Sequence, residues 1–224
     1  STPRTTLLRF NDFADVERLF AEDSDIAAVI LEPMLANAGC IMPAPGYLLH
    51  VQEVAHRHGA LVICDEVLMG FRLFAGLAGL QAGLDPDIAS VGKAIGNGVP
   101  VSAIVGKPHI LAGFEEGRVL RGGTFSGNPM ACAAVISTLA QLDDADYQIL
   151  IARGEALRVS VEASFKAHGM TVSTSGYGNV FGIWPSAQAP TNYAEALECG
   201  DAEFSKALHL ALREAGVLVK PSPY

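Results

Sequence analysis

Two short apolar runs flank an amphipathic helical pattern in the first third of the chain, and this arrangement constrains the fold most strongly. Residues 26–31 and 60–64 are apolar runs that predict buried strands. Between them Pro45 opens a helical pattern, and Gly59 is its expected stop. The order strand, helix, strand predicts a parallel βαβ unit and therefore an α/β fold with a mostly parallel sheet.

Further elements follow in the same manner. Besides a first helix over residues 11–21, we expect strands over 88–91 and 101–105, a helix from Asn128-Pro129 towards 142, a helix over 147–168, antiparallel strands over 172–175 and 179–185, a helix over 202–215 and a last strand over 217–220. The expected elements change from alternating strands and helices to an antiparallel strand pair with separate helices in the last part of the chain. We therefore predict a large domain over residues 1–140 and a smaller α+β domain over residues 141–224.

Composition and charge exclude several classes of function. The formal net charge of -9 argues against nucleic acid or an anionic membrane as the main partner. No apolar run approaches the roughly 20 residues that a membrane span needs. The four cysteines show no C-x-x-C spacing, so we expect a cytoplasmic, reduced protein without disulfides and without a structural metal site.

Polar residues follow several of the predicted strands, where ligands of α/β sheets bind. Asp65 comes after five apolar residues, so we expect it to be largely buried and to need a cation or hydrogen bonds. A helix cap or an ion pair with Arg72 explains Asp65 as well as a function does. Lys93 stands in a glycine-rich turn and is a candidate amine nucleophile, although an exposed loop lysine is the commoner case for such a residue alone.

A third stretch combines glycines, hydroxyls and a helix start. Residues 121–129 read Arg-Gly-Gly-Thr-Phe-Ser-Gly-Asn-Pro. Free backbone N–H groups and the helix dipole favour phosphate at such a place. Ordinary helix capping by Ser126 or Asn128 explains the same residues, and glycine-plus-hydroxyl loops are common. This stretch gains weight only together with Asp65 and Lys93.

These segments together resemble the class III aminotransferases, which are pyridoxal-phosphate enzymes of fold type I, and most of all their glutamate-1-semialdehyde aminomutase branch. Four motifs carry the resemblance in the family's order and spacing: Glu32-Pro33, Asp65-Glu66-Val67-x-x-Gly70-Phe71-Arg72, Gly92-Lys93-x-x-Gly96-x-Gly98-x-Pro100 and Gly123-Thr124-x-Ser126-Gly127-Asn128-Pro129. The similarity spans almost the whole chain. It implies a large domain with a mostly parallel sheet, followed by a smaller α+β domain.

The resemblance also implies a role for each matching residue. Lys93 matches the catalytic lysine that forms a Schiff base with pyridoxal 5'-phosphate and moves a proton. Asp65 matches the aspartate that keeps the pyridinium nitrogen protonated, and Val67 matches the valine packed on the ring. Thr124 matches a threonine that reaches the cofactor phosphate of the neighbouring subunit. The resemblance further implies a homodimer with a shared phosphate site. It also implies a small amino acid or amine as the substrate.

The chain departs from the family pattern at two positions and at its ends. Met69 stands where the family usually has threonine, and Asn97 stands where it has a third glycine. Family members carry well over a hundred residues before the equivalent of Ser1, and they continue beyond Tyr224. We therefore expect either a piece of a longer enzyme or, as the alternative, a truncated and non-catalytic relic with weak or no cofactor binding.

Overall fold

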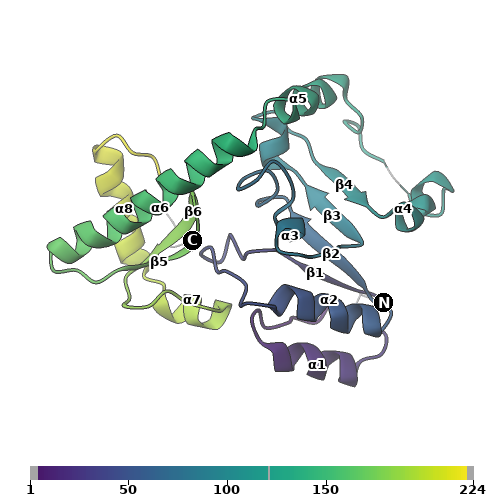
Figure 1. Ribbon diagram of the computed structural model, residues 1–224, viewed down its shortest axis with the longest axis horizontal. Helices are drawn as coiled ribbons and strands as arrows, with labels where there is room; N and C mark the ends of the chain where they lie inside the picture. Colours follow the sequence, from purple (N-terminus) through teal and green to yellow (C-terminus); the bar gives the residue numbers. More distant parts are fainter. Residues whose placement is uncertain (1–4, 121, 221–224) are drawn as a thin grey trace. The chain divides into compact units, whose positions relative to one another are not determined.

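The computed structural model describes residues 5–120 and 122–220, and these form two compact units. Among the described residues, one unit comprises 12–33, 45–120 and 122–147, and the other comprises 5–11, 34–44 and 148–220. Figure 1 labels the helices and strands of both. The predicted division into domains at residue 140 stays a prediction.

The first unit is built on a four-stranded sheet with the order β1(Ala28–Leu31), β2(Leu61–Glu66), β3(Ile88–Val91) and β4(Ala103–Gly106). The pairs β1–β2 and β2–β3 are parallel, and β3–β4 is antiparallel. The predicted parallel βαβ unit is confirmed, because α2(Tyr47–Arg57) connects β1 to β2. The mostly parallel sheet in Figure 1 is the α/β arrangement expected from the sequence.

Helices cover one face of this sheet more fully than the other. Val62, Cys64 and Glu66 of β2 are buried, and α2 and α3(Ala78–Gln81) pack on β2. The alternate residues of β2 are only half-buried, and Ile30 of β1, which shares their face, is 66% exposed. Alternation of strand side chains thus gives the sheet a packed face and an open face.

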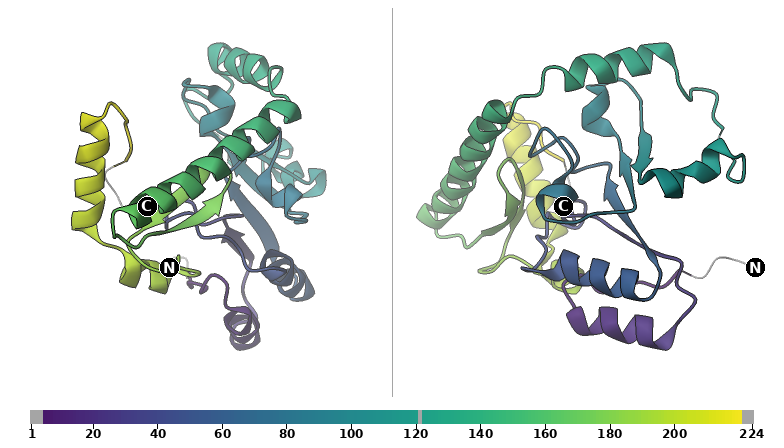
Figure 2. Two further views of the ribbon diagram at one scale, coloured as in Figure 1. Left: turned by 60° about the vertical axis from the view of Figure 1, so that its left-hand side comes forward. Right: turned by 45° about the vertical axis from the view of Figure 1, so that its right-hand side comes forward.

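Local sequence explains the helices that support the packed face. Asp12 caps α1(Phe13–Glu22) by accepting a hydrogen bond from the Asp15 N–H at 2.9 Å. The helix packs on α2 (Figure 2). The rings of Phe13 and Tyr47 meet edge to face, with their centroids 5.4 Å apart. Further along the chain lie η1(Lys93–Gly96), α4(Pro108–Glu115) and α5(Pro129–Leu139), and α5 packs beside η1.

The second unit contains α6(Asp144–Ala167) for most of its length, the hairpin β5(Ser173–Tyr177) and β6(Val180–Trp184), and the helices α7(Tyr193–Cys199) and α8(Ala202–Glu214). The predicted antiparallel hairpin is confirmed. Its core is formed by Trp184, Ile41 and Ala196, which are essentially inaccessible to solvent. The last strand predicted over residues 217–220 is wrong, because this stretch is irregular.

Candidate active site

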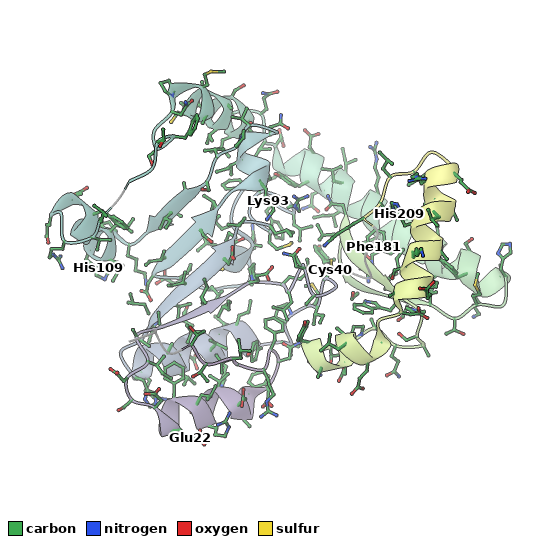
Figure 3. All side chains as sticks on the ribbon, turned by 180° about the vertical axis from the view of Figure 1, so that it is seen from behind. Glu22, Cys40, Lys93, His109, Phe181 and His209 are labelled. Carbon is green, nitrogen blue, oxygen red and sulfur yellow. The ribbon has the colours of Figure 1, made fainter. Side chains whose placement is uncertain are left out.

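Asp65 and Lys93 come from the carboxyl ends of two adjacent parallel strands. Asp65 pairs with Ser90 across β2 and β3, and Lys93 follows the last residue of β3 by two positions. Neighbouring strands lie about 4.8 Å apart, so both residues belong to the same edge of the sheet. Lys93 is exposed and begins η1, beyond the end of β3 (Figure 3).

The Asp65 side chain is held by hydrogen bonds and not by a cation. Its Oδ1 accepts the Val67 N–H at 2.9 Å and the Ser90 hydroxyl at 3.0 Å. Within residues 5–120 and 122–220, no cation pairs with Asp65 and no donor reaches its Oδ2. Arg72 instead donates from Nε to the Leu68 carbonyl at 2.9 Å. The alternative of an ion pair with Arg72 is therefore not realised.

The expectation that Asp65 is largely buried is wrong, because Glu66 is the buried carboxylate of this pair. Asp65 is half-buried on the open face of the sheet, whereas Glu66 points to the packed face and is 1% exposed. Residues 61–66 alternate between half-buried and buried in the structure, so Asp65 and Glu66 lie on opposite faces of the sheet. The apolar run before Asp65 does not alternate in polarity and gives no signal for which face is packed.

Glu66 fixes the segment that follows β2. Its Oε1 accepts the Gly79 N–H at 2.6 Å, and its Oε2 accepts the Ala78 N–H at 3.1 Å. Desolvation raises the pKa of Glu66, although these backbone hydrogen bonds oppose the shift. Tyr147 holds the same segment by donating its hydroxyl to the Phe71 carbonyl at 2.8 Å. Val67 is therefore at the start of a segment tied down at two places.

Val67 lies next to the backbone that precedes Lys93. Its Cγ1 is 3.5 Å from the point that a Cβ on Gly92 would occupy. The site edge thus combines a carboxylate, an apolar side chain and an amine. Thr124 is exposed in the turn before α5, and no described contact joins it to the other three residues.

The two departures from the family pattern have local explanations. Lys93 and Asn97 both adopt left-handed backbone conformations, with φ of 43° and 45°. Asparagine is among the few non-glycine residues that tolerate this region, so it serves where the family has glycine. Such a conformation costs lysine about 1 kcal/mol, and strain of this kind concentrates at functional sites. Met69 is fully buried and packs in the core.

The stretch over residues 122–129 contains a helix cap. Asn128 accepts the N–H groups of Met130 at 3.0 Å and Ala131 at 3.2 Å at the start of α5. The capping interpretation is therefore confirmed for Asn128. Arg121, which precedes this stretch in the sequence, lies outside the described residues.

The residues at this edge fit pyridoxal phosphate by the chemistry of their side chains. The cofactor needs an amine for its aldehyde and an acid for its ring nitrogen. Lys93 supplies the first, and Asp65 supplies the second with one carboxylate oxygen unengaged by described residues. Val67 offers apolar surface next to Gly92, the residue that precedes Lys93.

Comparison with known proteins leads to one family. The model of the class III aminotransferases matches residues 6–223. A glutamate-1-semialdehyde 2,1-aminomutase of Nitratidesulfovibrio vulgaris is 37% identical over 100% of this chain and 53% of its own length. The chain spans about half the length of the curated relatives it matches.

Solved structures agree with the sequence match. A β-phenylalanine aminotransferase from Variovorax paradoxus superposes with a TM-score of 0.89 at 28% identity, over 100% of this chain and 53% of that chain. A glutamate-1-semialdehyde-aminomutase from Pseudomonas aeruginosa in complex with PMP gives a TM-score of 0.85 at 28% identity, over 97% and 50%. The expected resemblance is confirmed, and the chain belongs to the class III aminotransferase family.

Proposed function

We propose that the complete protein binds pyridoxal 5'-phosphate and transfers an amino group to or from a small amino acid or amine. The observation that carries the proposal is the register of β2 and β3. Asp65 pairs with Ser90, and Lys93 follows shortly after Ser90 in the chain, so an acid and an amine lie at adjacent strand ends. Family membership and a structural relative in complex with PMP support the same cofactor.

Each residue of the site has a definite task in this proposal. Bound pyridoxal phosphate supplies an aldehyde for an amine and an electron-poor ring that stabilises negative charge on the substrate carbon. Lys93 holds the cofactor through Nζ and carries the proton to and from the substrate carbon. Asp65 keeps a proton on the ring nitrogen through its Oδ2. Val67 covers one face of the ring and excludes water there.

A borohydride experiment tests the assignment of Lys93. The complete protein is incubated with pyridoxal phosphate, reduced and digested, and the modified peptide is identified by mass spectrometry. We expect the label on Lys93 and its loss in Lys93→Ala. Lys166→Ala, which changes a lysine in the last turn of α6, is the matched control and should keep the label. A reducible label of equal amount on another residue of Lys93→Ala would disprove the role of Lys93.

The finer reaction type is either that of an aminotransferase or that of an aminomutase. Similarity to an aminomutase over this whole chain supports the second, and similarity to a β-phenylalanine aminotransferase supports the first. An external keto acid separates them, since an aminotransferase needs the acceptor to complete its turnover and an aminomutase does not. Turnover without any acceptor would favour the aminomutase.

We further propose a cytoplasmic homodimer in which Thr124 contacts the cofactor phosphate of the partner subunit. The free state of the four cysteines supports a reducing compartment. Along residues 5–120 and 122–220, no helix has the length and apolar character required to cross a bilayer. Thr124→Val should weaken cofactor binding, while sedimentation of the wild-type protein should give the mass of a dimer. A monomer that binds the cofactor with full affinity would refute the shared site.

A further inference from the structure

Ser90 makes the one side-chain hydrogen bond that Asp65 receives from the described residues. Its hydroxyl donates to Asp65 Oδ1 at 3.0 Å. The two residues are direct partners in the parallel pairing of β2 and β3, so their side chains leave the sheet on the same face. Ser90 is half-buried, as Asp65 is. Ser90 therefore touches the proposed cofactor-binding acid, and it lies outside the four motifs that carry the family resemblance.

Both donors to Asp65 converge on a single oxygen. The Val67 N–H reaches Oδ1 from the chain that follows the strand, and the Ser90 hydroxyl reaches it from the neighbouring strand. Two donors in different directions fix the plane of a carboxylate, whose terminal torsion is otherwise broad. Oδ2 is left as the acceptor that no described residue occupies. The two hydrogen bonds to Oδ1 thus leave Oδ2 as the oxygen available to a ligand.

The composition of β3 makes the serine conspicuous. The cross-strand partner of Ser90 in β4 is Ile104. Within β3, the residue two positions before Ser90 is Ile88, which lies on the same face of the sheet. Strands favour β-branched and aromatic residues at such positions. A hydroxyl here forgoes apolar packing, and its only described acceptor is Asp65.

We propose that Ser90 is a positioning residue that orients the Asp65 carboxylate towards the cofactor ring nitrogen. The proposal rests on the proposed function. A serine that merely ties β2 to β3 would affect the stability of the protein alone. A positioning serine also affects how tightly Asp65 holds the cofactor and at which pH the ring nitrogen loses its proton.

The test compares variants that differ by one hydroxyl. Ser90→Thr keeps the hydroxyl, and Ser90→Val introduces a side chain of the same shape as threonine without the hydroxyl. A comparison of these two variants therefore separates the hydrogen bond from packing. Ser173→Ala is the control, because Ser173 is a half-buried strand serine whose hydroxyl pairs with Ser186. The complete protein without cofactor is titrated with pyridoxal phosphate, and the absorption of the bound cofactor is followed against pH.

We expect Ser90→Val to weaken pyridoxal phosphate binding about tenfold, the effect of one charge-assisted hydrogen bond. The pH midpoint of the absorption change should fall, because a misplaced Asp65 stabilises the ring proton less. Ser90→Thr and Ser173→Ala should both match the wild-type protein. In an Asp65→Asn background, Ser90→Val should add almost nothing, since the serine acts through that carboxylate.

Wild-type affinity and pH midpoint in Ser90→Val would overturn the positioning role. Thermal unfolding of each variant without cofactor accompanies the titration, so a loss of stability with unchanged binding assigns Ser90 to strand pairing alone. Failure of the proposed function looks different, because the wild-type protein itself would then bind no cofactor and Asp65→Asn would change nothing.

Discussion

The carboxylate of Asp87 anchors the opposite end of the sheet, and its neutralisation gives a quantitative test of the fold. Asp87 precedes β3 and is 5% exposed. Its Oδ2 accepts the Val62 N–H at 2.9 Å and lies 2.8 Å from His56 Nε2, while its Oδ1 accepts from Lys107 Nζ at 3.1 Å. One side chain thus joins α2, the start of β2 and the residue after β4.

The sign of the pH effect follows from these partners. Burial by itself would raise the pKa of Asp87, but the hydrogen bonds from Val62, His56 and Lys107 outweigh it and the pKa is lowered. A carboxyl with a lowered pKa in the folded state stabilises the protein above its ordinary pKa. That contribution is lost as the pH falls from the ordinary aspartate pKa through the lowered one.

The expected loss in Asp87→Asn is about 1.5 kcal/mol at pH 7. The amide oxygen still accepts the Val62 N–H, but the bond loses its charge, which we take as about 0.5 kcal/mol. The contacts with His56 and Lys107 lose about 0.5 kcal/mol each, because both side chains are partly exposed and the solvent screens them. The free energy of unfolding in urea, measured from pH 7 down to about pH 2, gives both the loss and its pH dependence.

Asp85→Asn is the matched control, because Asp85 pairs with the same lysine at 2.9 Å but is 76% exposed on its side chain. We expect this variant to lose less than about 0.5 kcal/mol. Asp87→Asn should also lose less stability than the wild-type protein on acidification. An equal pH dependence in the two proteins, or equal losses in the two variants, would refute the anchoring role of Asp87.

Three further predictions concern the packing around the site and in the second unit. Gly39→Ala should lower the free energy of unfolding in urea by about 3 kcal/mol, because φ is 101° and a Cβ would lie 2.0 Å from the buried Trp184 ring. Gly169→Ala is the control, because Gly169 also has a positive φ but open space around it, and this variant should lose only about 1 kcal/mol. Equal losses in the two variants would contradict the clash. In the wild-type protein, the raised pKa of Glu66 means that stability falls as pH rises from the ordinary glutamate pKa to the raised one. Glu66→Gln should flatten this decline in a pH series of unfolding curves, and an unchanged slope would show that Glu66 is not its source. Tyr147→Phe removes a hydroxyl that donates to a backbone carbonyl, so it should cost about 1 kcal/mol in thermal unfolding, and no change would show that the bond contributes nothing.

The sequence predicted those elements whose cause is local. The apolar runs before Asp65 and Lys93 became β2 and β3, because a buried parallel strand needs only a short apolar segment and a stop. The short helix α3 was not predicted, since its first N–H groups bond to Glu66, which lies twelve and thirteen positions earlier. By contrast, α4 carries Pro108 in its first turn, a local signal that went unused.

The candidate site was predicted in its residue types but not in its supports. The spacing of Asp65 and Lys93 after their strands identifies the sheet edge, because parallel strands end together. The register that pairs Asp65 with Ser90 is not visible in the sequence, since it depends on how β2 and β3 slide along each other. Supporting residues are therefore harder to predict than the site residues they hold.

The two aspartates at opposite ends of the same strands argue for different roles. Asp87 has both oxygens engaged by the described residues, and its task of joining the strands is complete within the protein. Asp65 has two donors on one oxygen and none from the described residues on the other. A carboxylate used only to pair strands would be expected to engage both oxygens, as Asp87 does. The Oδ2 acceptor that no described residue engages is thus the feature of Asp65 that supports its proposed role in binding the cofactor.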